Sequence, residues 1–246
     1  MKDSLRIAML ISGGGTTMEQ ILMVCRLGGR LFGKVRPVLV IGSKHGIKGL
    51  DRAMGYGLEL GKDIFVLEPK CYPDPSAFGE AILTLCQQRA VDLIGQYGWL
   101  PRTPVNVVET YRDRMINQHP GPLRPGRFGF GGKGMMGTAV HTAVLWFARN
   151  VGREFPYTEA VAQRVAITYD EGVLLNVRQV PILQGDDVSS LQERVLPQEH
   201  EIQVETLLAF AENRVQELDL PDIVLPEEAD LLDQARKIAT TLYPHG

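Results

Sequence analysis

Cysteine is scarce in this chain, and its distribution argues against two kinds of cysteine-dependent protein. The three cysteines, Cys25, Cys71 and Cys86, are odd in number and are not spaced like metal ligands. A disulfide framework is therefore disfavoured, and reduced thiols in a cytosolic protein are expected instead. No cluster of His, Cys and carboxylates has ligand spacing either, so we expect no metal.

Long apolar runs and a strong net charge are also missing. No stretch approaches the ~18 consecutive apolar residues of a membrane span, and the first ten residues, MKDSLRIAML, lack the apolar region of a signal peptide. The formal charge of −3 gives no field that would attract a polyanion. We expect a soluble cytoplasmic protein that binds small-molecule substrates, with neither nucleic acid nor a membrane as partner. The sequence leaves open whether it forms a homodimer.

The order of the apolar runs predicts an α/β fold. Strands are expected at 5–11, 35–41, 63–67, 91–94 and 115–117, and helices at 18–27, 48–56, 75–88, 138–150 and 188–213. This alternation is typical of βαβ units in a mostly parallel, twisted sheet with helices on both faces. Two later apolar stretches, 165–169 and 173–182, are expected to complete the sheet.

The length of 246 residues fits one large α/β domain with elaborations, which we expect over 1–220. Residues 221–246 are expected to form a helical tail with one amphipathic pattern, PEEADLLDQARKIATTL. Residues 121–137 read GPLRPGRFGFGGKGMMG. This Gly-rich segment has too much glycine for a helix or a strand and is expected to be a loop.

The stretch ISGGGTT, at 11–17, joins the first predicted strand to the first predicted helix. A glycine-rich turn at that point exposes backbone N–H groups and the positive end of the helix dipole, which suit a phosphate. Thr16 and Thr17 add hydroxyl donors. The alternative is a tight turn in which Thr17 only caps the helix.

Asn117 and His119 lie two residues apart in the stretch MINQHPGPLRPG. If the strand continues through them, both side chains point to the same face, and Pro120 then ends the ladder. An amide and an imidazole at the carboxyl end of a strand lie where ligands bind in α/β sheets. Asp170, in ITYDEGVLL, is by itself most simply explained as a turn residue.

Together and in this order, these pieces resemble the folate-dependent formyltransferase family over about residues 5–215. ISGGGTT is similar to the family's phosphate loop, INQHPGPL to its Asn-x-His-Pro signature, and DEGVLLNVRQVPI to its Asp-x-Gly segment. RVLPQEHEI resembles its Gln-Glu-His segment, at the start of the last long helix. The resemblance implies a Rossmann-like formyltransferase fold.

The resemblance also implies formyl transfer from the co-substrate 10-formyltetrahydrofolate to the primary amine of glycinamide ribonucleotide, in purine biosynthesis. The amine attacks the formyl carbon directly, so no protein nucleophile is needed. Asn117 and a protonated His119 would donate hydrogen bonds to the oxyanion, and Asp170 would favour the charged form of His119. These three residues are the expected catalytic group.

The remaining site residues are carried over from the resemblance. Binding of the acceptor is expected at Gly14, Gly15, Thr16, Thr17, Gln198 and Glu199. The folate is expected to contact Leu100, Arg102, Thr103, Asn117, Thr168 and Asp170. For Glu199 the alternative is an exposed acid at a helix start, favoured by the dipole.

Two features depart from the family pattern, and a third matches it only loosely. Gln163 stands where a histidine usually precedes the catalytic Asp, and the segment between His119 and Asp170 is longer than usual by about fifteen residues. We expect its part at 127–136 to be a mobile flap, or else a surface loop or an oligomer contact. His141 matches a family histidine loosely, with a helix-face histidine as the alternative.

Two other functions remain open at this stage. An N-formyltransferase acting on an amino sugar nucleotide or another amine would keep Asn117, His119 and Asp170 but change the acceptor pocket. A non-catalytic folate- or nucleotide-binding relative would have lost turnover through the substitutions above. The extra domains of formyltransferases acting on initiator tRNA, and of formyltetrahydrofolate hydrolases, are not expected.

Overall fold

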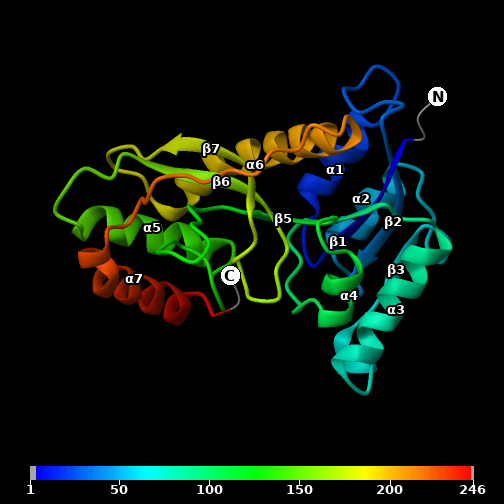
Figure 1. The fold of residues 1–246 in the computed structure, drawn as a ribbon, viewed down its shortest axis with the longest axis horizontal. Helices are drawn as coiled ribbons and strands as arrows, with labels where there is room; N and C mark the ends of the chain where they lie inside the picture. The colour runs from blue at the N-terminus through cyan, green and yellow to red at the C-terminus, as the bar shows by residue number, and fades with distance from the viewer. Residues whose placement is uncertain (1–3, 245–246) are drawn as a thin grey trace. The chain divides into compact units, whose positions relative to one another are not determined.

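Seven strands in the order β3-β2-β1-β4-β5-β6-β7 organise the computed structural model, which describes residues 4–244 (Figure 1). The chain forms two compact units. Unit 1 contains the residues up to Asn117 together with Gln203–Val215, and unit 2 contains Gln118–Ile202 and the residues from Gln216 onward.

Unit 1 is built on parallel strands. They are β1 (Leu5–Ile11), β2 (Val35–Gly42), β3 (Ile64–Val66), β4 (Leu93–Gln96) and the first part of β5 (Met115–His119). Residues 7–11 of β1 are completely buried, which explains why this strand is a continuous apolar run in the sequence. The carboxyl ends of all these strands point to the same edge of the sheet.

The helices of unit 1 connect these strands. They are α1 (Thr16–Val24), α2 (Lys48–Gly55), α3 (Pro75–Gln88) and α4 (Val105–Thr110), with a 3-10 turn at Pro69–Cys71. The start of α3 follows ordinary capping chemistry: the Asp74 carboxylate accepts from the Ala77 N–H at 2.8 Å, and Pro75 occupies the first turn.

Unit 2 pairs β6 (Tyr157–Arg164) with β7 (Leu174–Pro181) in an antiparallel hairpin. The helices α5 (Thr138–Asn150) and α7 (Ala229–Leu242) pack side by side, and a 3-10 turn at Pro226–Glu228 precedes α7 (Figure 1). The long helix α6 (Val188–Ala211) begins in unit 2 and ends in unit 1.

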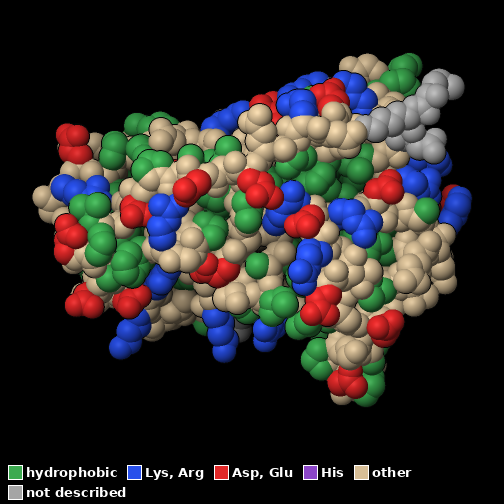
Figure 2. All heavy atoms as spheres, in the orientation of Figure 1, with side chains coloured by type: hydrophobic (Ala, Val, Ile, Leu, Met, Phe, Trp, Pro, Cys, Tyr) green, Lys and Arg blue, Asp and Glu red, His purple; other side chains and the backbone are tan. Residues whose placement is uncertain are grey.

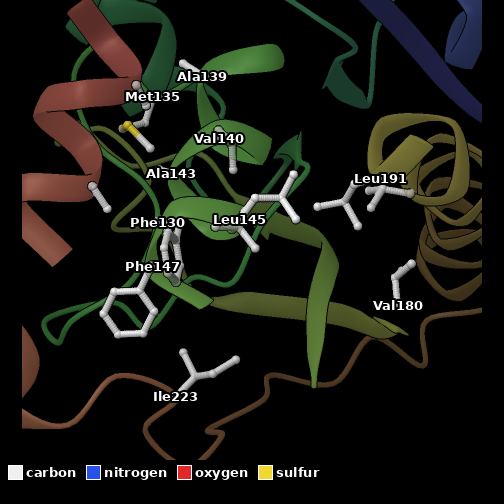
Figure 3. Packing of buried hydrophobic residues seen from close by; sticks show 14 of the residues in the cluster. Phe130, Met135, Ala139, Val140, Ala143, Leu145, Phe147, Val180, Leu191 and Ile223 are labelled. Atoms are coloured by element: carbon white, nitrogen blue, oxygen red, sulfur yellow. The ribbon is translucent and has the colours of Figure 1, made fainter. Parts of the chain in front are cut away.

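The core of unit 2 gathers aromatic and aliphatic side chains from the Gly-rich segment, α5, the hairpin and the C-terminal residues (Figure 3). The residues expected to form a tail contribute Ile223, Val224, Leu232, Ala235 and Ala239 to this core. The domain boundary at residue 220 stays a prediction, but the segment beyond it is an integral part of unit 2.

The structure confirms the predicted mostly parallel α/β sheet and corrects two segments. Residues 165–169 are not a strand, because the strand before the turn is β6, at Tyr157–Arg164. That strand contains three buried polar residues, Thr158, Glu159 and Gln163. Because of them it lacks the apolar pattern by which a buried strand is recognised in a sequence. The six-residue helix α4 was not predicted, because it is too short to show a helical period.

Within residues 4–244 no helix is both long and apolar enough to cross a membrane. The same part of the chain contains no group of three or more His, Cys, Asp or Glu residues arranged to hold a metal ion. Lysine, arginine and acidic side chains are interspersed over the face in Figure 2. That face therefore offers no extended surface of one charge sign.

Candidate active site

The glycine-rich turn of unit 1 lies between the end of β1 and the start of α1. Gly15 is the residue before the helix, has a left-handed φ of +68°, and provides no side-chain cap. A Cβ there would also lie 2.8 Å from the Cα of Gly49, whose N–H donates to the Gly13 carbonyl at 3.1 Å. Glycine is thus required at position 15 by backbone conformation and by close packing.

The four residues predicted to bind a phosphate differ in exposure. Gly14 is exposed, Gly15 and Thr16 are half-buried, and Thr17 is buried in the first turn of α1. The helix begins at Thr16, so Thr17 is not its cap. The first N–H groups of α1 have no side-chain cap, which is the arrangement that suits an anion.

Ser12 connects three segments at the carboxyl edge of the sheet in unit 1. Its Oγ accepts from the Ser43 hydroxyl at 2.8 Å and from the Leu100 N–H at 2.9 Å, and its N–H donates to the Gly98 carbonyl at 3.0 Å. Ser12 and Ser43 were not predicted from the sequence as site residues. Their one signal is a hydroxyl within two residues of the end of each of two predicted parallel strands.

The residues predicted to contact a folate in unit 1 follow β4. Leu100 and Arg102 are exposed, and the Thr103 hydroxyl accepts from the Gln96 amide at 2.5 Å. Gln96 and Asn117 are register partners in β4 and β5. This part of the sheet edge therefore presents several polar side chains, of which Asn117 is half-buried.

His119 is the last residue of β5 and is only 3% exposed. Its Nε2 lies 3.1 Å from the Phe130 carbonyl oxygen, and its Nδ1 lies 3.7 Å from Oδ1 of Asp170. The second distance is too long for a hydrogen bond and is an ion-pair distance only when the imidazole is protonated. The structure thus brings together two of the three residues predicted to be catalytic, and Asn117 precedes His119 by two positions on β5.

Asp170 lies in the turn between β6 and β7 with a left-handed φ of +57°. Its carboxylate accepts two hydrogen bonds of 2.9 Å, from the Gln163 side-chain amide to Oδ1 and from the Gly132 backbone N–H to Oδ2. Gln163, at the position of the usual family histidine, therefore contacts the carboxylate directly. Thr168, predicted to bind the folate, is exposed two residues before Asp170.

His141 lies on α5 and is almost completely buried. Burial, with a smaller contribution from the nearby His119, lowers the pKa of His141 to about 4. Its Nδ1 has no hydrogen-bond partner among the described residues. His141 is therefore a neutral buried imidazole at neutral pH.

Glu199 lies in the middle of α6 and is 5% exposed, so the alternative of an exposed acid at a helix start is wrong. Burial raises the pKa of its carboxyl to about 8. The neighbouring Gln198 accepts from the Arg178 guanidinium at 3.3 Å. One turn further along α6, Gln203 is fully buried, and neither atom of its amide has a partner within the described chain.

The Gly-rich segment is a loop, as predicted, but several of its residues are anchored to the rest of unit 2. Arg124 forms a buried, two-pronged ion pair with Glu159 on β6, with distances of 2.8 and 2.9 Å. Phe130 is completely buried in the core of unit 2. Met135 is buried in the same core. Mobility of the segment 127–136 stays a prediction.

Comparison with known proteins identifies relatives over most of the chain. A sequence model of the formyl transferase family matches residues 5–207. The chloroplastic phosphoribosylglycinamide formyltransferase of Arabidopsis thaliana is 29% identical over 212 residues, which cover 85% of this chain and 66% of the relative. The corresponding enzyme of Vigna unguiculata is also 29% identical, over 85% of this chain and 62% of its own. The chain thus spans somewhat less than two thirds of these curated relatives.

Solved structures of similar proteins show the same fold. Glycinamide ribonucleotide transformylase 1 from Symbiobacterium toebii has a TM-score of 0.74 and 30% identity, covering 89% of this chain and 96% of that one. Its counterpart from Geobacillus kaustophilus has a TM-score of 0.71 and 26% identity, covering 85% of this chain and 99% of that one.

Proposed function

Because the chain belongs to the formyl transferase family, we propose that it transfers the formyl group of 10-formyltetrahydrofolate to the amine of glycinamide ribonucleotide in purine biosynthesis. The names of its relatives support this acceptor. One observation supports the proposal above all: His119, the last residue of β5, lies close to Asp170. Asn117 lies on the same strand, two residues before His119. Both substrates are small molecules, and the reaction needs no metal.

The proposed reaction is a direct acyl transfer. The amine nitrogen of the acceptor bonds to the formyl carbon, and the carbonyl electrons move onto oxygen. The bond from that carbon to the folate nitrogen then breaks, and the proton lost by the amine is transferred to that nitrogen. The protein must stabilise the oxyanion and support the proton transfer.

His119 and Asn117 are the proposed donors to the oxyanion. A carbonyl oxygen only accepts, so the 3.1 Å contact places a proton on His119 Nε2, pointing at Phe130. For His119 to stabilise the oxyanion, this N–H must exchange the Phe130 carbonyl for the formyl oxygen. Asp170 faces the other ring nitrogen, with its Oδ1 3.7 Å from His119 Nδ1.

The acceptor is proposed to bind through backbone and neutral groups. The N–H groups of Gly14, Gly15, Thr16 and Thr17 would bind the phosphate, since the start of α1 has no side-chain cap. Glu199, with a pKa of about 8, carries a proton at neutral pH. It is therefore suited to an amide or hydroxyl group of the acceptor rather than to a cation, with Gln198 beside it.

The folate is proposed to contact the residues carried over from the resemblance to the family. In unit 1 these are Leu100, Arg102 and Thr103, together with Asn117. In unit 2, Thr168 and Asp170 are flanked by the exposed apolar side chains of Ile167 and Tyr169. Exposed apolar groups beside a carboxylate and a hydroxyl suit an aromatic ring system with polar edges.

A steady-state assay tests this function and its acceptor. We expect formyl transfer from 10-formyltetrahydrofolate to glycinamide ribonucleotide, with kcat/KM well above that for an amino sugar nucleotide. A higher kcat/KM for the sugar nucleotide would overturn the acceptor, and no turnover with any amine would leave a binding protein. A cytoplasmic location and a homodimer remain predictions. The former would agree with the three cysteines, which are all free thiols.

A further inference from the structure

Three consecutive residues of the Gly-rich segment contact both members of the His119–Asp170 pair. The Phe130 carbonyl lies 3.1 Å from His119 Nε2, and the Gly132 N–H donates to Asp170 Oδ2 at 2.9 Å. Gly131 lies between them, against Asp170. Both interactions come from the backbone, so they depend on where the segment lies and not on the chemistry of its side chains.

The Phe130 side chain fixes the position of this backbone. Its ring is fully buried, with centroids 5.5 Å from the ring of Phe147 and 6.0 Å from that of Phe155, both in edge-to-face geometry. Figure 3 shows Phe130 close to Phe147 in the core of unit 2. The Phe130 N–H also donates to the Pro122 carbonyl at 2.7 Å. The carbonyl that faces His119 is thus held from both sides.

This carbonyl selects one tautomer of His119. Because the oxygen cannot donate, the single proton of the neutral imidazole must be on Nε2. The unprotonated Nδ1 then faces the Asp170 carboxylate. When the ring takes up a second proton, that proton arrives beside Asp170.

Gly131 leaves the space that the Asp170 carboxylate occupies. A Cβ at position 131 would lie 2.6 Å from Asp170 Cβ and 3.0 Å from its Oδ2, and also 2.6 Å from Leu123 Cδ2. The turn that holds Asp170 is also tightly packed on its other side, because a Cβ at Gly172 would overlap the Arg164 carbonyl. The backbone of Asp170 therefore cannot move away easily. A side chain at position 131 must therefore displace the carboxylate.

We propose that the backbone of Phe130–Gly132 is the positioning element of the site: it sets the tautomer of His119 and the place of the Asp170 carboxylate. Its effect on turnover rests on the proposed function, whereas its effect on the His119 ring does not. On this proposal the Gly-rich segment positions His119 and Asp170.

The first test reads the His119 ring without any substrate. Long-range ¹H–¹⁵N spectra of the histidine side chains, assigned with a His119→Gln variant, report which ring nitrogen carries the proton. We expect the Nε2–H form of His119 at alkaline pH. A dominant Nδ1–H form in the parent protein would overturn the proposal, whatever its activity.

The second test uses Gly131→Ala, with Gly55→Ala as its matched control. Gly55 is exposed on α2, and a Cβ there meets nothing within 4 Å. Displacing a catalytic group by about 1 Å can cost about 100-fold in rate. We expect kcat of Gly131→Ala to fall on the order of 100-fold, with KM for glycinamide ribonucleotide changed less than about threefold, and parent values for Gly55→Ala. Parent kcat in a folded Gly131→Ala would overturn the positioning role while leaving the proposed function intact. An inactive parent protein with the expected ring spectrum would overturn the proposed function while leaving the effect on the His119 tautomer intact.

Discussion

The side-chain amide of Gln163 donates from Nε2 to Oδ1 of Asp170 over 2.9 Å, and Gln163 is itself only 2% exposed. Oδ1 is also the Asp170 oxygen nearest to His119. Gln163 therefore fixes the oxygen that faces the imidazole, and it does so with a group that does not titrate. We expect it to act through Asp170 as a positioning residue.

Replacing Gln163 with Leu should lower turnover without weakening binding of the acceptor. Leu fills a similar volume but cannot donate, and a hydrogen bond to a charged group contributes about 1.5–3 kcal/mol. Since this interaction is expected to matter mainly in the transition state, kcat should fall about 10- to 100-fold while KM for glycinamide ribonucleotide stays near the parent value.

Gln163→His is the matched comparison, because an imidazole N–H can restore a donor to Asp170. It should recover much of the rate lost in Gln163→Leu. Equal rates for the parent and Gln163→Leu, or a His variant no better than the Leu variant, would show that the 2.9 Å contact has no positioning role.

The buried Glu199 should make stability depend on pH. Burial raises its pKa from 4.5 to about 8, so the folded protein retains a proton that the unfolded chain releases. The group therefore destabilises the fold progressively as pH rises from about 4.5 to about 8, each pKa unit corresponding to about 1.4 kcal/mol.

Glu199→Gln removes this titration. The free energy of unfolding of the variant, relative to the parent, should increase between pH 4.5 and pH 8 and then level off. Urea unfolding of both proteins across this range measures the difference. A difference that does not change with pH would mean that Glu199 is ionised in the folded protein.

His141 should destabilise the fold in acid. Its pKa falls from 6.5 to about 4 on folding, so below about pH 6.5 the unfolded chain binds a proton that the folded protein does not. Stability should therefore be lost as pH falls from about 6.5 to about 4. Thermal unfolding of His141→Gln should show a weaker loss over this range. His45→Gln, at an exposed position, should follow the parent, and a His141→Gln curve parallel to the parent's would argue against a neutral His141.

Removing one member of the Arg124–Glu159 ion pair should lower the free energy of unfolding more than removing both charges. Both side chains are less than 3% exposed, so Arg124→Met leaves an unpaired carboxylate inside unit 2. Breaking a buried pair typically costs 3–5 kcal/mol, so we expect a loss of about that size in urea unfolding. Adding Glu159→Gln should recover a large part of the loss. No recovery would mean that the arginine acts by packing alone.

The sequence predicted what depends on regular apolar patterns. The buried run at 7–11 marked β1, and the Asp74-Pro75 start marked α3. It could not predict β6, because Glu159 belongs inside the core only when Arg124, far away in sequence, lies opposite. That pairing becomes visible only when the chain is folded.

Some residues of the candidate site were likewise predictable from the sequence, whereas their contacts were not. Asn117 and His119 were predictable from their spacing at a strand end, and Asp170 from the resemblance. The contacts of Asp170 with Gln163 and Gly132 depend on a left-handed turn and on a close backbone approach, which no local pattern encodes. The burial of Glu199 was missed because Gln198 and His200 beside it are polar, and the packing around the middle of α6 is not visible in the local sequence.

The most direct test of the central claim is the rate of formyl transfer to glycinamide ribonucleotide by the parent and by His119→Ala, both saturated with 10-formyltetrahydrofolate. Removing a single oxyanion donor typically lowers kcat about 10²–10³-fold. The account predicts a parent enzyme that turns over, and a folded His119→Ala variant slower by about that factor with little change in KM. Parent-like turnover in His119→Ala would contradict the assignment of His119 as the donor that stabilises the transition state.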